Sequence, residues 1–69
     1  MDAVEKMCHD QPAVIVYKNQ LGSYTAVAVE RGTSLISVER HSSEYNVCEG
    51  NTPMLAIKNL AAKLGYSSD

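Results

Sequence analysis

Four side chains of the kinds that bind transition metals occur in this sequence, namely Cys8, His9, His41 and Cys48. A zinc site needs three or four such ligands that converge, and they usually come in Cys-x-x-Cys or His-x-x-x-His pairs. The sequence contains neither pair, and the adjacent Cys8 and His9 would project to different sides of a helix. We therefore predict that the chain has no metal site and no other cofactor.

The groups that could act as catalytic nucleophiles are Cys48 and the two serines that follow His41. Cys48 precedes Glu49, whose negative charge opposes formation of a thiolate. The serines, Ser42 and Ser43, lie in a polar bend, where hydroxyl groups commonly bond to their own backbone. The sequence also has no Gly-x-Ser-x-Gly motif and no glycine-rich phosphate loop, so we predict that the protein is not an enzyme.

The bulk composition is typical of a small folded globule. The chain has 69 residues, of which 45% are hydrophobic and 20% are charged, and its formal net charge is −2. This length allows one small α+β domain, spanning residues 1–69. The longest apolar runs fall far below the roughly 20 residues that a membrane-spanning helix needs. Residues 1–6 include acidic side chains where a secretion signal has basic ones, so we expect a cytoplasmic protein with two free, reduced cysteines.

The first two thirds of the chain are expected to form a short helix and a series of strands. A helix is predicted for residues 2–9, because Pro12 blocks its continuation. Runs rich in β-branched or alternating apolar residues predict four strands, at residues 13–18, 24–30, 34–40 and 44–49. A five-residue loop at 19–23 would join the first two strands as a hairpin.

The clearest helix signal follows these strands. Thr52 is placed to act as an N-cap, Pro53 suits the first helical position, and Gly65 suits a left-handed C-terminal cap after Leu64. The predicted core face of this helix consists of Met54, Ile57, Leu60, Ala61 and Leu64. The expected fold is therefore α+β: an antiparallel meander of three to four strands, one C-terminal helix packed on one face, and a short N-terminal helix.

The alternation of side chains along the predicted strands divides the sheet into two faces. The face expected beneath the C-terminal helix carries Val14, Val16, Thr25, Val27, Val29, Ile36, Val38, Tyr45 and Val47. The second face carries Ala13, Ile15, Tyr17, Tyr24, Ala26, Ala28, Leu35, Ser37, Asn46 and Cys48. This second face is too apolar to be left in water, so we expect the N-terminal segment, through Val4 and Met7, or a second subunit or a target protein to cover it.

Six apolar or aromatic side chains are candidates for contact with a partner. They are Ile15, Tyr17, Tyr24 and Leu35 on the second face, and Leu55 and Tyr66 on the outer side of the C-terminal helix. Single exposed apolar residues are also common on protein surfaces without any binding role. We predict a non-enzymatic protein-interaction or inhibitor module that binds a protein partner or forms a homodimer, without contact to a membrane.

Nucleic-acid binding is the alternative function. A short helix, antiparallel strands and a C-terminal helix resemble the element order of double-stranded-RNA-binding domains. That resemblance implies a lysine-rich start to the last helix, whereas this sequence has Thr52-Pro53-Met54-Leu55 there. Binding would have to use Lys18, Arg31, Arg40, Lys58 and Lys63, and the acidic balance of the chain argues against it.

A second resemblance concerns residues 14–18, residues 24–29 and the segment from Gly50 to Leu60. Together they resemble the hairpin and the helix entry of HicB-type domains, which are small sheet-plus-helix proteins that neutralise a toxin partner. This sequence differs in having an additional predicted strand between the hairpin and the helix. The resemblance implies a compact, non-enzymatic module that binds another protein. The small size of the chain and its expected autonomous fold suit an accessory gene of a phage or mobile element.

Overall fold

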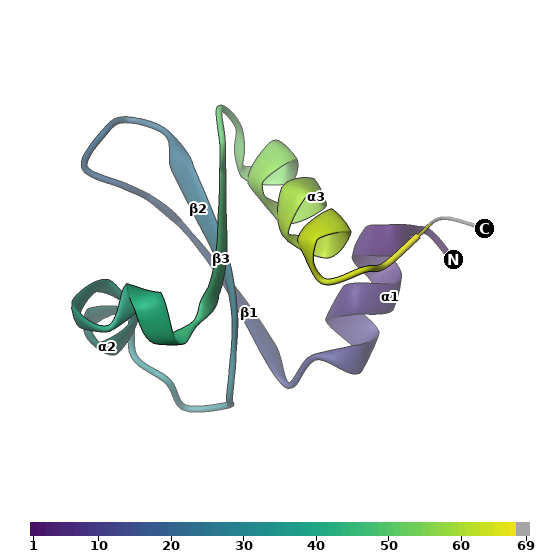
Figure 1. Cartoon of the computed structure of the whole chain (residues 1–69), viewed down its shortest axis with the longest axis horizontal. Coiled ribbons are helices and arrows are strands. Elements are labelled where there is room, and N and C mark those ends of the chain that lie inside the picture. The colour runs from purple at the N-terminus through teal and green to yellow at the C-terminus, as the bar shows by residue number, and fades with distance from the viewer. Residues whose placement is uncertain (68–69) are drawn as a thin grey trace.

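The computed structural model describes residues 1–67 and shows a three-stranded antiparallel sheet between helices (Figure 1). The elements are α1 (Ala3–Asp10), β1 (Ala13–Lys18), β2 (Tyr24–Val29), α2 (Leu35–Arg40), a 3-10 turn η1 (Ser42–Glu44), β3 (Asn46–Gly50) and α3 (Pro53–Lys63). The strand order is β1-β2-β3. Helices α1 and α3 lie on one side of the sheet, and α2 lies on the other (Figure 1). The predicted α+β class, with a C-terminal helix on the sheet and a short N-terminal helix, is confirmed. No helix in this part of the chain has the length and apolar character to cross a membrane.

Helices α1 and α3 both begin at a side-chain N-cap, and the sequence predicts the one at Thr52. Asp2 Oδ1 accepts a hydrogen bond of 2.8 Å from the Glu5 N–H and starts α1, which ends before Pro12. Thr52 Oγ1 accepts one of 3.0 Å from the Leu55 N–H and starts α3. Gly65, at a φ of 89°, follows the end of α3 in the left-handed conformation that glycine favours.

The segment predicted as a third strand, residues 34–40, is the helix α2 instead. Ser34 Oγ accepts a hydrogen bond of 3.1 Å from the Ser37 N–H, which is an N-cap interaction that starts a helical turn. Only Val38 of this helix is buried, whereas Leu35 and Ile36 are 39% and 63% exposed. A strand with apolar residues on both faces is stabilised when both faces are buried, and this segment buries only one side chain. The N-cap at Ser34 therefore determines its helical conformation.

The two faces of the sheet also differ from the prediction. The hairpin loop places Lys18 opposite Tyr24 and Val16 opposite Ala26, so Val16 shares a face with Ala26 and not with Val27. Helix α3 packs on that face, where Val14, Val16, Tyr24, Ala26, Ala28 and Cys48 lie. The expectation that α3 covers the Val27 side is therefore wrong, because it combined β1 and β2 in a register one residue out.

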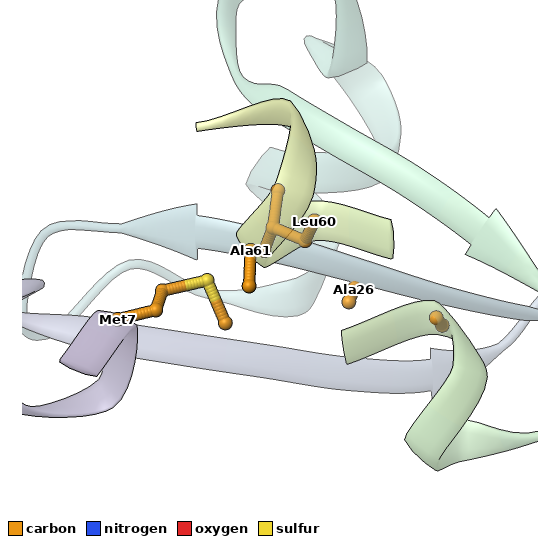
Figure 2. Packing of buried hydrophobic residues seen from close by; sticks show 5 residues of the cluster. Met7, Ala26, Leu60 and Ala61 are labelled. Carbon is orange, nitrogen blue, oxygen red and sulfur yellow. The ribbon is translucent and has the colours of Figure 1, made fainter. Parts of the chain in front are cut away.

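Helix α2, rather than the N-terminal segment, covers part of the other face. Val38 packs with Val27 and Val29, and the half-buried Ala13, Ile15, Tyr17, Tyr45 and Val47 surround them. Met7 of α1 is fully buried, but it packs on the α3 side with Leu60 and Ala61. Figure 2 shows its thioether directed at Ala61. The core face of α3 is formed by Ala56, Leu60 and Ala61 with Ile57 and Leu64 beside them, whereas Met54, predicted to be in the core, is 52% exposed.

Candidate functional site

The six side chains predicted to contact a partner do not form one surface. Ile15 and Tyr17 lie together on the α2 side of the sheet, where both remain half-buried. Tyr24 lies on the opposite side and packs into the α3 core cluster. Leu35 is the partly exposed first residue of α2. Only the pair on β1 therefore shares a site as expected.

The remaining two candidates lie on the helical side of the molecule. Leu55 is 41% exposed near the start of α3. Tyr66 follows α3 and joins it to α1, because its hydroxyl donates a 2.7 Å hydrogen bond to Asp10 Oδ2 and accepts one of 3.1 Å from Gln11 Nε2. The bond from Gln11 lowers the pKa of Tyr66, but the hydrogen bond to Asp10, desolvation and the Asp10 charge together raise this pKa above its ordinary value. The phenol thus has an intramolecular role at this joint.

The hydrogen-bond ladder defines which backbone groups face outward at the two edges of the sheet. Asn19 N–H donates to Ser23 O at 2.8 Å, so this is a hydrogen-bonded pair at the end of the β1–β2 ladder. Such pairs alternate along antiparallel strands. Counting back in the observed register, Ala13, Ile15 and Tyr17 direct their N–H and C=O groups to β2, and Val14, Val16 and Lys18 direct theirs away from it.

The outer edge of β3 is capped by side chains of α3. The same alternation, continued across β2, directs the backbone groups of Val47 and Glu49 outward. Lys63 Nζ donates to Val47 O at 3.1 Å, and Asn59 Nδ2 donates to Glu49 O at 2.8 Å. Both outward carbonyl groups of β3 therefore accept hydrogen bonds within the chain, which makes them less available for pairing with another strand.

The outer edge of β1 has no equivalent cap. Within residues 1–67, no side chain or main-chain group forms a hydrogen bond to the outward N–H and C=O groups of Val14, Val16 or Lys18. The strand carries no charged side chain before Lys18, and its residues 13–17 are all half-buried, whereas most of β2 is buried. An unpaired, apolar edge strand of six residues is a template on which another strand can form.

A groove lies over the hairpin end of the sheet on the α2 side, from the end of β1 across β2 to β3. Its volume is about 380 Å³, and its walls are formed by the end of β1 and the hairpin loop, by β3, and by the end of α2. Tyr17 and Val47 supply apolar surface, and Lys18, Glu39 and Glu49 supply charge. At the tip of the hairpin, Leu21 is 85% exposed.

The residues considered for chemistry in the sequence are dispersed in the structure. Cys8 is exposed on α1, Cys48 is half-buried on the α3 side of β3, and both are free thiols. His41 Nδ1 lies 3.5 Å from Glu44 Oε2, at the surface of the turn after α2. In residues 1–67, no three His, Cys, Asp or Glu side chains are placed to hold a metal ion together.

Side-chain patterns alone do not predict that the backbone groups of Val14, Val16 and Lys18 face outward. Their positions follow from the length of the hairpin loop and the alternation of antiparallel pairs. A loop at residues 19–23 therefore already determines which backbone groups of β1 face outward. The caps from Asn59 and Lys63 depend on how α3 lies along β3, which no local pattern encodes.

Comparisons with protein-family models, with curated proteins and with solved structures found no match to this chain. The HicB-like resemblance therefore stays a prediction.

Proposed function

We propose that this protein is a protein-interaction module that binds an extended polypeptide segment by strand addition at the β1 edge. The observation that carries this proposal is the difference between the two sheet edges: Asn59 and Lys63 donate to the outward carbonyl groups of β3, whereas the outward groups of β1 have no partner within residues 1–67. Main-chain hydrogen bonds supply affinity in this mode of recognition, and pockets for alternate side chains supply specificity.

The surroundings of β1 favour an apolar segment. On the α2 side, Ile15 and Tyr17 present half-buried apolar surface next to the groove. On the α3 side, Val14 and Val16 are also half-buried. A bound strand with apolar residues on both faces would extend both core clusters, and its burial would stabilise the complex. Action as an inhibitor and an origin in a phage or mobile element stay predictions from the sequence.

A peptide-library selection on the immobilised protein tests this function. We expect enrichment of extended, alternately apolar peptides, whose binding is lost when alternate peptide amides are N-methylated. Val16→Pro should abolish their binding, because it removes an outward N–H that takes no part in the β1–β2 ladder. Val14→Pro, which removes the next outward N–H, is the second test variant, and Met54→Ala at an exposed position of α3 is the control.

The result depends on the variants remaining folded, which far-ultraviolet circular dichroism and thermal unfolding establish for each. Peptides that bind Val16→Pro and Val14→Pro as well as the unmodified protein would contradict strand addition. Salt-dependent retention of the protein on duplex RNA, in place of peptide binding, would favour the nucleic-acid alternative.

A further inference from the structure

We propose that the strand added to β1 is β1 of a second copy of this chain, paired antiparallel about a two-fold axis at Val16, which joins the two sheets into one. This inference rests on the proposed function and names its partner. Antiparallel addition about a two-fold axis uses the same edge in both copies. A strand that is complementary to itself can therefore supply both sides of the interface. The β1 edge meets this requirement in its backbone, its side chains and its charge.

The backbone selects the register. Hydrogen-bonded pairs between the two copies must join residues whose groups face outward, which are Val14, Val16 and Lys18. With the axis at Val16, this residue pairs with itself and Val14 pairs with Lys18 of the second copy, which gives about six hydrogen bonds across the interface. With the axis at Ile15, Lys18 would face Pro12, which has no N–H to donate. The Val16 register therefore uses every outward group of the strand.

Side chains fit the same register. Ile15 lies opposite Tyr17 of the second copy on the α2 side, and cross-strand pairs of an aromatic and a β-branched residue stabilise sheets. Val16 lies opposite Val16 of the second copy on the α3 side. Each of these residues is half-buried in one copy, so pairing turns β1 from an edge strand into an interior strand and removes apolar surface from water.

Charge does not oppose this arrangement. Lys18 is the one charged residue of β1, and the antiparallel register puts the two copies of Lys18 at opposite ends of the paired strands. The apolar Val14 faces each of them, so no like charges lie directly opposite. A single strand pair is a small interface, so we expect a weak dimer in exchange with the monomer.

Cysteine cross-linking tests the partner and the register together. The background variant is Cys8→Ser/Cys48→Ala, because both native thiols are free. Into it, Val16→Cys is introduced, since a hydrogen-bonded pair with Cα atoms about 5.5 Å apart is within disulfide range. Ile15→Cys reports the alternative register, and Met54→Cys, exposed on α3, reports random collision.

Under the same thiol–disulfide buffer, Val16→Cys should form a covalent dimer at least about tenfold faster than Met54→Cys, since pairing raises the local thiol concentration. Sedimentation equilibrium of the unmodified protein should show a concentration-dependent dimer that Val16→Pro abolishes. A dimer cross-linked faster through Ile15→Cys would overturn the register. An unmodified protein that stays monomeric, with Val16→Cys cross-linking no faster than Met54→Cys, would overturn the second copy as partner.

The two proposals fail separately. If the chain stays monomeric and library peptides still bind in a manner sensitive to Val16→Pro, strand addition stands and the second copy is wrong. If neither a dimer nor such peptides are found, strand addition itself is wrong.

Discussion

Lys63 Nζ lies 3.1 Å from the main-chain oxygen of Val47 and donates a hydrogen bond to it, from the last turn of α3 to the outer edge of β3. Asn59, one helical turn earlier, makes the same kind of contact with Glu49 O at 2.8 Å. Lys58, on the same helix, is exposed and makes no such contact. These two donors therefore occupy the outward carbonyl groups of β3, whereas the outward carbonyl groups of β1 accept no hydrogen bond within residues 1–67.

Removal of both donors should open the second edge. In the variant Asn59→Leu/Lys63→Met, each lost hydrogen bond should lower the free energy of unfolding by about 0.5–1.5 kcal/mol, as measured by urea denaturation. With two open edges, the chain should associate beyond a dimer, because strand addition at both ends of a sheet does not close. Light scattering measures this association.

Lys58→Met is the matched control for that variant, since it removes a lysine charge from α3 without uncapping β3. Equal association of the control and the double variant would contradict the role of the caps.

Met7 is the buried residue that attaches α1 to the rest of the core. Its side chain is fully buried against Leu60 and Ala61, and α1 is a helix of eight residues that has little stability alone. Met7→Ala should lower the free energy of unfolding by about 2–5 kcal/mol, a large share of the total for a chain of this length. Met54→Ala, at a residue 52% exposed, should change it by less than about 0.5 kcal/mol. Similar costs for the two methionines would show that α1 is not docked through Met7.

The sequence carried more information about the fold than about the arrangement of its faces. The caps at Thr52 and Gly65 are local, and the structure has both of them where the sequence predicts them. The sequence predicts the hairpin loop at residues 19–23 correctly, but the apolar pattern places Val16 on the face of Val27, a register that this loop does not allow. A side-chain pattern with apolar residues on both sides of β1 and β2 gave no warning of that error.

Residues 34–40 show a different limit. Ile36 and Val38 favour a strand by propensity, while the Ser34 cap favours a helix, and over six residues the two signals are close in strength. The segment forms a helix because only Val38 packs into the sheet, where it contacts Val27 and Val29. That is a tertiary contact, so it lies beyond what the segment itself encodes.

Gly50 is required at the end of β3 because the backbone of α3 passes directly over it. A Cβ atom at this position would lie 2.5 Å from Ala56 N and 2.8 Å from the Leu55 carbonyl carbon, and backbone atoms of a packed helix cannot move aside cheaply. Gly50→Ala should therefore lower the free energy of unfolding by about 1–3 kcal/mol, the range for overpacked sites. The measurement is urea denaturation followed by circular dichroism.

Gly22→Asn is the control, at a glycine with a φ of 87° and open space around it. Asparagine tolerates the left-handed conformation, so this change should cost less than Gly50→Ala. The opposite order would contradict the close approach of α3 to β3.

Tyr66 links the end of α3 to α1 through Asp10 and Gln11, and its raised pKa makes this joint sensitive to alkaline pH. The folded state holds the phenol proton more tightly than the unfolded state, whose pKa is the ordinary 10.0. The stabilisation is therefore fully present below pH 10.0, and it is lost as the pH rises through the folded-state pKa. In thermal unfolding, the unmodified protein should lose stability in that range more steeply than Tyr66→Phe, which has no phenol proton to lose.

The cause of the raised pKa is tested by substitution of Asp10. In Asp10→Asn, the pKa of Tyr66, followed by the ring carbon NMR signal, should fall toward 10.0. Glu5→Gln removes an equal charge from α1 and should leave the pKa of Tyr66 unchanged. A Tyr66 titration unchanged by Asp10→Asn would show that the carboxylate does not set its pKa.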